Sequence, residues 1–366
     1  MQIGVYNCAG RLSFSDKSND PKTMNRFLLL CIGCALLTYS LAHLYRLIAI
    51  ALQIVDTPNH RSAHQGLVPT GAGVSFVLVF LVGFFFVSKY EVLTGSNVAL
   101  YSVLPALMVV AIIGFIDDYH PLSWKFRFTV HALCCAYIVW VTGVPGLNIL
   151  GVEVDLGFGG MAMAVLGLIW LLNLYNFMDG IDGIATGEAL CVLTFATAIT
   201  LYFELGGVAH PVILLLACCA GFLIINWPRA RAFMGDGGSG FLGLFFGVLA
   251  VTETMLPIWS WLILLGWFMT DTTLTITLRL FRGQKIHEAH SEHAYQHLNR
   301  AFGTTSTLLL VFVSNTVWLL PLSALAAISE DWGFGLVILA YMPLIIAQYY
   351  CGAGQPTPKL ILGKQN

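Results

Sequence analysis

The sequence is poor in charged residues. Lys, Arg, Asp and Glu make up 10% of its 366 residues, against roughly 25% in soluble domains. Hydrophobic residues make up 58%. This composition excludes a soluble globular protein and predicts a polytopic membrane protein, nearly all of which lies in the lipid bilayer. No nucleic-acid partner is expected.

Internal repeats and segments of alternating hydrophobicity are also lacking, which excludes an outer-membrane barrel, whose strands alternate over about ten residues. The chain instead contains continuous apolar runs, each near the roughly 20 residues that a membrane-spanning helix needs. We therefore predict an all-α bundle of about 11 transmembrane helices, in a single domain over 24–352 with a short cytoplasmic tail over 353–366. The predicted spans are 27–47, 71–88, 98–116, 128–146, 160–178, 184–203, 208–226, 239–256, 258–279, 304–327 and 333–350.

Basic residues are missing from every second connection between these runs. The connections after runs 2, 4, 6, 8 and 10 contain only Lys89, whereas the others contain nearly all the Arg and Lys of the bundle. The positive-inside rule places the basic connections in the cytoplasm, on the side where most of the motifs below also fall. Residues 1–23 would lie outside but carry Arg11, Lys17 and Lys22. We interpret them as a disordered extension or an over-called start, with Met24 as the alternative.

The nine cysteines lie mostly inside apolar runs. Cys31 and Cys34 have the spacing of a redox motif, but they fall within a predicted membrane helix rather than near a βαβ pattern. We interpret the cysteines as packing residues.

Aspartates stand at the ends of several apolar runs, where a carboxylate is costly and seldom without a role. Asp117 and Asp118 end run 3, and adjacent helical residues point about 100° apart. One can therefore face a metal or substrate while the other orients it or takes a proton. The alternative is a solvated helix end.

Amides and carboxylates recur every three residues at the end of run 5, as Asn173, Asn176, Asp179 and Asp182. This spacing predicts a polar stripe along one side of a helix end. Such a stripe faces a cavity or protein rather than lipid, and Gly180 and Gly183 would let a substrate approach the backbone. A polar seam between helices is the alternative.

A glycine-rich segment around Asp236 precedes run 8. Glycines that lead into a helix N-terminus can form a phosphate-binding cradle of backbone N–H groups. Asp236 suits a hard cation such as Mg²⁺, which takes oxygen ligands and often bridges to substrate phosphates. The nearby Arg229 and Arg231 strengthen this interpretation.

Histidines are concentrated in the most basic stretch of the chain, which contains His287, His290 and His293. We expect these histidines to contact a diphosphate, with structural zinc as the alternative. We favour the diphosphate because zinc prefers a closed set of nitrogen and sulfur ligands and no cysteine is near in sequence.

In the first cytoplasmic loop, Arg61 and His64 could reach phosphate or belong to an ordinary loop. Asp271, in run 9, either pairs with a basic residue or supports the site.

Five motifs together resemble the polyprenyl-phosphate N-acetylhexosamine-1-phosphate transferases, and they run in family order from about residue 56 to residue 300. The motifs are Asp56-x-Pro-Asn-x-Arg-Ser-x-His64, Gly114-x-x-Asp-Asp118, Asn173-x-x-Asn-Phe-x-Asp-Gly-x-Asp-Gly183, Phe233-Met-Gly-Asp-x-Gly-Ser239 and His290-x-x-His-Ala-Tyr-Gln296.

The resemblance implies a multi-pass enzyme of the bacterial inner (cytoplasmic) membrane with its active-site loops in the cytoplasm. Such an enzyme transfers a sugar 1-phosphate from a UDP-N-acetylhexosamine to undecaprenyl phosphate and releases UMP, with Mg²⁺, or alternatively Mn²⁺, as cofactor. A homodimer is compatible with the family.

The resemblance also implies roles for individual residues. Asp236 is the first candidate metal ligand, and Asp117 and Asp118 share base and metal duties that sequence does not divide between them. The catalytic pocket would include Asp179 and Asp182. The implied substrate contacts are Asn173, Asn176, Asn226, Phe233 by stacking on uracil, Arg61, His64, His290, His293 and Arg300.

Two departures from the family pattern bear on the substrate. The stretch Thr70-Gly-Ala-Gly73 lacks the arginine and the third glycine common there, and the last motif lacks a clustered triple histidine. The latter favours the branch that initiates O-antigen or related surface glycans, with a donor such as UDP-GlcNAc, or a FucNAc or QuiNAc sugar. The alternatives are the phospho-MurNAc-pentapeptide transferase and, from another class, an ion-coupled transporter, which should place its polar residues near the midplane.

Overall fold

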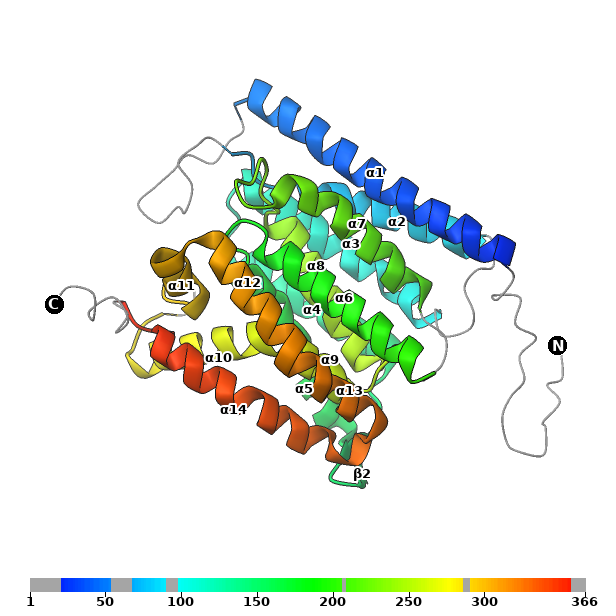
Figure 1. Ribbon diagram of the computed structural model, residues 1–366, viewed down its shortest axis with the longest axis vertical. Coiled ribbons are helices and arrows are strands. Elements are labelled where there is room, and N and C mark those ends of the chain that lie inside the picture. Colours follow the sequence, from blue (N-terminus) through cyan, green and yellow to red (C-terminus); the bar gives the residue numbers. More distant parts are fainter. Residues whose placement is uncertain (1–20, 54–67, 90–97, 206–208, 286–289, 357–366) are drawn as a thin grey trace.

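The structure is a computed structural model that describes residues 21–53, 68–89, 98–205, 209–285 and 290–356. These residues form a helical bundle with one small hairpin (Figure 1), which confirms the all-α class. The helices are α1 (Pro21–Ala51), α2 (Val74–Lys89), α3 (Val98–Tyr119), α4 (Trp124–Thr142), α5 (Gly157–Phe177), α6 (Ile184–Tyr202), α7 (His210–Asn226), α8 (Asp236–Val251), α9 (Ile258–Leu264), α10 (Gly266–Phe281), α11 (Ala294–Phe302), α12 (Thr304–Ser314), the π-helical turn η3 (Asn315–Leu319), α13 (Leu320–Ile328), the 3₁₀ turn η4 (Glu330–Trp332) and α14 (Gly333–Cys351).

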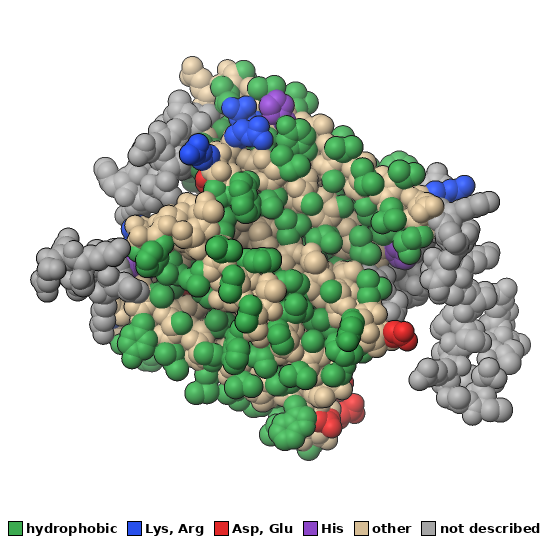
Figure 2. Space-filling view, viewed as in Figure 1, with side chains coloured by type: hydrophobic (Ala, Val, Ile, Leu, Met, Phe, Trp, Pro, Cys, Tyr) green, Lys and Arg blue, Asp and Glu red, His purple; other side chains and the backbone are tan. Residues whose placement is uncertain are grey.

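Membrane-spanning character is clear for part of this bundle. Among the described residues, six helices are long and apolar enough to cross a bilayer, or seven if the bent pair α9 and α10 is one span. Helices α2, α7 and α8 are shorter and apolar. These elements coincide with the predicted runs, although the number of about 11 spans stays a prediction. Figure 2 shows hydrophobic side chains spread over one face of the bundle, with acidic and basic groups mainly at its margins.

The prediction of one continuous helix over 258–279 is wrong. The segment divides into α9 and α10, which meet at an angle of 73°. Gly266 begins α10, and a Cβ there would lie 3.2 Å from side-chain atoms of Leu319 and Tyr341. A glycine at this point permits close packing at the bend, as at other helix kinks. The bend directs α10 toward α11.

The sequence also gave no sign of the antiparallel hairpin β1 (Leu147–Ile149) and β2 (Val152–Val154), which joins α4 to α5. Each strand has three residues, too short for a visible alternation. Asn148 holds the hairpin in place. Its side-chain amide donates to Asp331 (2.9 Å), and its backbone carbonyl accepts from the Trp259 indole N–H (2.9 Å).

Helix α8 forms the centre of the bundle and is buried from Gly237 to Val251. It packs against α3 and α5. Close approach to α5 requires small residues, because a Cβ on Gly243 would lie 2.7 Å from the Leu171 carbonyl oxygen. Small residues at such contacts are typical of membrane helices. On its other side, α8 packs phenylalanines against those of α2.

The cysteines lie as predicted for packing residues. Eight of them fall in the described ranges, all as free thiols, and six of these are buried.

Candidate active site

Three helix ends meet where α3 stops and α8 starts. Asp117 and Asp118 lie in the last turn of α3, and Asp236 is the first residue of α8 rather than part of a preceding loop. The backbone N–H of Asp236 donates to Oδ1 of Asp118 at 2.9 Å. Two motifs that are 118 residues apart in sequence are therefore in direct contact.

Glycines of the same two motifs permit this contact. A Cβ on Gly114 would lie 2.5 Å from the Asp236 carbonyl carbon and the Gly237 nitrogen. Gly235 has φ of +76°, and a Cβ there would overlap with Oδ2 of Asp118. Gly235, which belongs to the segment predicted to form a phosphate cradle, therefore leaves room for the side chain of Asp118.

The segment before α2 closes one side of this site. Ala72 and Gly73 donate their N–H groups to the carbonyls of Phe233 (3.0 Å) and Met234 (2.9 Å), and the Phe233 N–H donates to Pro69 (2.8 Å). The glycine-rich stretch of the first motif therefore supports the Asp236 segment through backbone hydrogen bonds.

Arg127 links two of the aspartates. Its Nη1 lies 2.9 Å from Oδ2 of Asp236 and is also paired with Oδ2 of Asp117. Oδ1 of Asp117 accepts the N–H of Leu122 at 2.6 Å. The sequence interpretation counted Arg127 only among the basic residues of its connection. Its position ten residues after Asp117, in the first turns of the next helix, was the available signal.

Asp118 is the least satisfied carboxylate here. Its Oδ1 accepts from Asp236, but its buried Oδ2 has no hydrogen-bond partner among the described residues. A buried oxygen with no donor is unfavourable unless a proton, a cation or a ligand completes it.

The predicted helical stripe of amides and carboxylates is wrong in part. Asn173 and Asn176 lie on α5, but α5 ends at Phe177, so Asp179 and Asp182 lie in the connection to α6. The glycines of this motif favour a turn over a further helical turn, and Gly183 has φ of +75°.

These four residues differ in their contacts. The Asn176 amide donates to Ser239 Oγ at 3.3 Å and lies against Asp236, which joins α5 to the site. Asn173 donates to Ile169 of its own helix (2.7 Å), and Asp182 accepts the Ala230 N–H (2.9 Å).

Asp179 lies within electrostatic range of the other aspartates. Burial, followed by the charges of Asp236, Asp118 and Asp182, raises the pKa of Asp179 well above its usual range. We call Asp117, Asp118, Asp179, Asp182 and Asp236 the carboxylate cluster. Arg127 is a cation in direct contact with two members of the cluster, and a further cation would relieve the repulsion among the carboxylates that raises the pKa of Asp179.

His290 and His293 lie beside the cluster, at the end of α5. Their rings stack at 4.9 Å between centroids, and Phe177 lies 6.5 and 6.4 Å from them. The Tyr295 hydroxyl donates to the Phe177 carbonyl at 3.0 Å. A Cβ on Gly180 would overlap with that hydroxyl, so Gly180 makes room for Tyr295.

Not every predicted contact residue faces this site. Asn226 is 2% exposed, and its amide is engaged by Thr186 (2.9 Å) and by the Ala232 carbonyl (3.1 Å). Arg300 binds the Ser291 carbonyl (2.7 Å) and His297 (2.8 Å), which fixes its own loop. Phe233 is half-buried. Arg61, His64 and His287 lie outside the described residues.

The donor chemistry suits a hard cation better than zinc. Within the described ranges, no group of three His, Cys, Asp or Glu side chains stands ready to hold a metal ion. Zinc at the histidines therefore has no support there. Mg²⁺ often takes only one or two carboxylates plus substrate phosphates, and the oxygens of Asp118 and Asp236 fit that pattern.

Sequence comparison finds proteins that are similar to this chain. The family model described as glycosyl transferase family 4 matches residues 100–254, which include the whole carboxylate cluster. A probable undecaprenyl-phosphate N-acetylglucosaminyl 1-phosphate transferase of Bacillus subtilis (strain 168) is 25% identical over 301 residues, covering 80% of this chain and 82% of its own.

Two further relatives have similar names. The undecaprenyl-phosphate alpha-N-acetylglucosaminyl 1-phosphate transferase of Escherichia coli (strain K12) is 26% identical over 325 residues, which are 84% of this chain and 85% of the relative. The decaprenyl-phosphate N-acetylglucosaminephosphotransferase of Mycobacterium leprae (strain TN) is 27% identical over 237 residues, or 60% of each chain.

Proposed function

We propose that this chain, which the glycosyl transferase family 4 model matches over residues 100–254, is a member of that family and transfers N-acetylglucosamine 1-phosphate from UDP-N-acetylglucosamine to undecaprenyl phosphate. The other product is UMP. The relatives' names support this acceptor and this sugar. A first step of O-antigen or related surface-glycan synthesis is the process we propose for it.

The observation that carries the proposal is the carboxylate cluster at one end of an apolar bundle. Asp117 and Asp118 come from α3, Asp236 from α8, and Asp179 from the end of α5. An acceptor with a lipid tail and a phosphate head needs such an arrangement, because its tail stays in the bilayer while its head meets polar groups. The charge pattern of the connections supports a cytoplasmic site in the bacterial inner membrane.

Mg²⁺ is the cofactor we propose, and oxygens of Asp118 and Asp236 would hold it when the donor is bound. When bound, such an ion offsets the charge of the diphosphate. Mn²⁺ is the alternative. The guanidinium of Arg127 neutralises part of the charge of Asp117 and Asp236 before any substrate binds.

The reaction exchanges one phosphoanhydride for another. A non-bridging oxygen of the lipid phosphate attacks the phosphorus that carries the sugar, and the bond from that phosphorus to the bridging oxygen breaks. UMP leaves with the electron pair on that oxygen. Asp117, held by Leu122 and Arg127, would orient the lipid phosphate, and positioning with charge neutralisation would supply most of the catalysis.

The histidine pair extends the site toward the donor. Burial, then the charges of His293 and Arg279, lowers the pKa of His290 to about 4. His290 is therefore neutral at pH 7 and acts as a hydrogen-bonding group rather than as a cation. Asn176, next to Asp236, and Asp179 would line the same pocket. The proposed nucleotide contacts of Asn226 and Phe233, the proposed homodimer and the contacts of Arg61 and His64 stay predictions.

The test is to incubate the purified protein with undecaprenyl phosphate, Mg²⁺ and a panel of UDP-sugars while following UMP release and the lipid product. We expect stoichiometric UMP and lipid-linked sugar with UDP-N-acetylglucosamine, abolished by EDTA. Product only with another UDP-N-acetylhexosamine would change the sugar. Product only with UDP-MurNAc-pentapeptide would assign the peptidoglycan branch, and no product with any donor from folded protein would overturn the proposal.

A further inference from the structure

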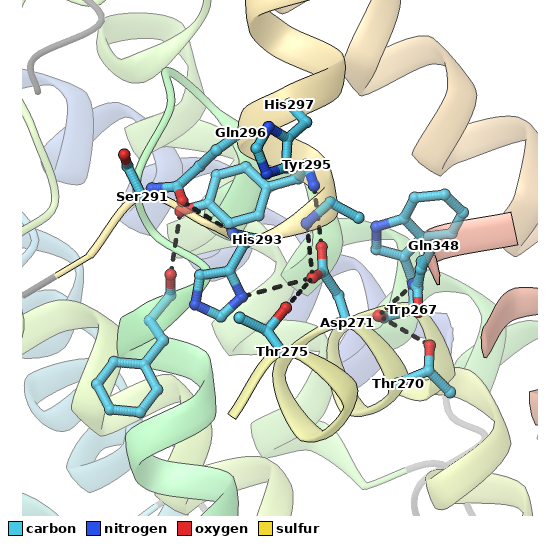
Figure 3. A network of polar contacts seen from close by, with 12 residues as sticks. Trp267, Thr270, Asp271, Thr275, Ser291, His293, Tyr295, Gln296, His297 and Gln348 are labelled. Atoms are coloured by element: carbon cyan, nitrogen blue, oxygen red, sulfur yellow. Dashed lines mark hydrogen bonds and ion pairs between the residues drawn. The ribbon is translucent and has the colours of Figure 1, made fainter. Parts of the chain in front are cut away.

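Asp271 lies outside the carboxylate cluster and is completely buried, on α10. Figure 3 shows it at the centre of a polar network between α10 and α11. Its Oδ1 accepts the N–H of Ala294 (2.9 Å) and the hydroxyl of Thr275 (3.2 Å), and its Oδ2 accepts the N–H of Tyr295 (3.0 Å). Both carboxylate oxygens are thus occupied by donors.

The nearest cation on the same helix is engaged elsewhere. Arg279 pairs with Glu292 at 2.9 Å, and Arg282 pairs with the other oxygen of Glu292 at 2.5 Å. Asp271 therefore pairs with neither of these arginines. Its charge is directed at the first residues of α11 instead.

A carboxylate at this place can hold α11. Ala294 and Tyr295 are the first helical residues, so their N–H groups have no partner within the helix, and negative charge stabilises a helix N-terminus. The helix has nine residues, and a helix that short is marginal without such support.

Asp271 also faces His293, which precedes α11. Oδ1 lies 3.4 Å from the His293 Nδ1, and this buried nitrogen makes no hydrogen bond within the described part of the chain. A carboxylate at this distance favours a proton on the nitrogen that faces it and so influences the orientation of the ring. The Gln296 side chain accepts the His293 N–H at 3.2 Å, so the residue is fixed through both backbone and ring.

From α11 the network reaches the carboxylate cluster. Tyr295 binds the Phe177 carbonyl, and the His293 ring lies 6.4 Å from the Phe177 ring. Phe177 ends α5, two residues before Asp179. The C-terminal segment adds a further tie, because Gly354 donates to the Glu292 carbonyl (2.7 Å).

We infer that Asp271 is a positioning residue: it fixes His293 and the start of α11 so that the histidine pair is aligned with the carboxylate cluster for binding of the nucleotide sugar. This inference rests on the proposed transferase function. Asp271 itself touches no substrate.

Asp271→Asn is the test, because it keeps the size of the side chain but replaces one acceptor oxygen by a donor. Displacement of a binding group by about 1 Å can cost about 100-fold. We expect the KM for UDP-N-acetylglucosamine to rise and kcat/KM to fall by about that factor. The Mg²⁺ concentration for half-maximal rate should not change.

The activity-independent readout is carbethoxylation of the histidines by diethyl pyrocarbonate, mapped by peptide mass spectrometry. His293 is 2% exposed and should be protected in the wild type, with half-buried His290 as the internal reference. Asp271→Asn should expose His293. The modification experiment tests the role of Asp271 even if the wild type shows no transferase activity. Such a loss of activity would count against the proposed function alone.

Glu188→Gln is the matched control. Glu188, on α6, is another buried carboxylate (2% exposed). It accepts a hydrogen bond from Asn315 of η3 at 2.5 Å, not from a residue of α11. The Glu188→Gln variant should change neither KM nor His293 protection.

Thr275→Val is the second variant, because it removes one hydrogen-bond donor to Asp271. It should give a smaller effect of the same sign, and it replaces Asp271→Asn if that variant does not fold. Full His293 protection with unchanged KM in the variant that folds would overturn the inference.

Discussion

Asp118 and Asp271 are both carboxylates at the same end of the bundle, yet their surroundings differ. Oδ2 of Asp118 is buried without a hydrogen-bond partner among the described residues, whereas both oxygens of Asp271 accept backbone N–H groups. A saturated carboxylate has little capacity left for a ligand, and an unsaturated one is costly until a ligand binds. The comparison separates a residue that holds the protein from one that is available to substrate and cation.

The same contrast appears in the charges around each residue. Around Asp118, two members of the carboxylate cluster, Asp117 and Asp236, pair with the guanidinium of Arg127. Near Asp271, Arg279 and Arg282 share Glu292. The first region carries negative charge that a divalent cation would neutralise, and the second has its charges matched within the protein.

Asp236→Asn should have the largest effect on the unsaturated region. Loss of a cation-binding oxygen removes several kcal/mol of transition-state stabilisation, so kcat should fall on the order of 1000-fold. UMP release at saturating substrate measures it. Asp331→Asn is the control, because Asp331 contacts Asn148 of the hairpin instead. Near-normal activity of Asp236→Asn would remove Asp236 from the proposed metal site.

Arg127→Ala tests the cation within the cluster. Without the guanidinium, kcat should fall by about 10- to 100-fold, as is typical when a partner of a ligating carboxylate is removed. The Mg²⁺ concentration for half-maximal rate should fall as well, because Arg127 no longer competes for Asp236. Arg127→Lys should restore part of kcat. A higher Mg²⁺ requirement in Arg127→Ala would contradict the competition.

Gly180→Ala tests the connection between the two regions. The added methyl group would displace the Tyr295 hydroxyl from the Phe177 carbonyl, and we expect a loss of about tenfold or more in kcat/KM from the resulting misplacement. Gly187→Ala is the control, since a Cβ there meets nothing within 4 Å. In the double variant with Tyr295→Phe the two effects should be less than additive. Additive effects would mean that the glycine and the tyrosine act separately.

The smallest effect concerns stability against pH. The pKa of His290 is lowered to about 4 in the folded protein, below its value of about 6.5 in the unfolded chain. Between these values the unfolded state binds more protons, so stability is lost as the pH falls from 7 toward 4. His290→Gln should reduce the decrease in melting temperature between pH 7 and pH 5. His120→Gln, on an exposed turn, should not, and equal slopes in all three proteins would contradict the assignment.

The sequence predicted the bundle well because continuous apolar runs mark membrane helices directly. It also singled out Asp117, Asp118 and Asp236 as candidate site residues, because charged residues are rare in this apolar chain, and the structure brings the three together. It did not predict the bend at Leu265, because an apolar run reads the same whether its helix is straight or broken. It assigned Asp179 and Asp182 to a helix on their spacing, although Gly180 and Gly183 stop α5 first.

Other features depended on contacts between distant segments. Arg127 lies 109 residues from Asp236, and nothing local singles it out from other basic residues. The role of Gly180 depends on Tyr295, which lies on another helix. Asn226 and Arg300 have the right type for substrate binding, but hydrogen bonds with Thr186, Ala232, Ser291 and His297 occupy them.

The most direct test of the contrast between the two regions compares Asp118→Asn with Asp271→Asn. The rate at which labelled N-acetylglucosamine 1-phosphate is transferred from UDP-N-acetylglucosamine to the lipid is measured as a function of Mg²⁺ concentration. The account predicts that Asp118→Asn shifts the Mg²⁺ requirement upward or abolishes transfer, whereas Asp271→Asn raises the KM for the sugar nucleotide at an unchanged Mg²⁺ requirement. An unchanged Mg²⁺ requirement in Asp118→Asn, or a shifted one in Asp271→Asn, would contradict it.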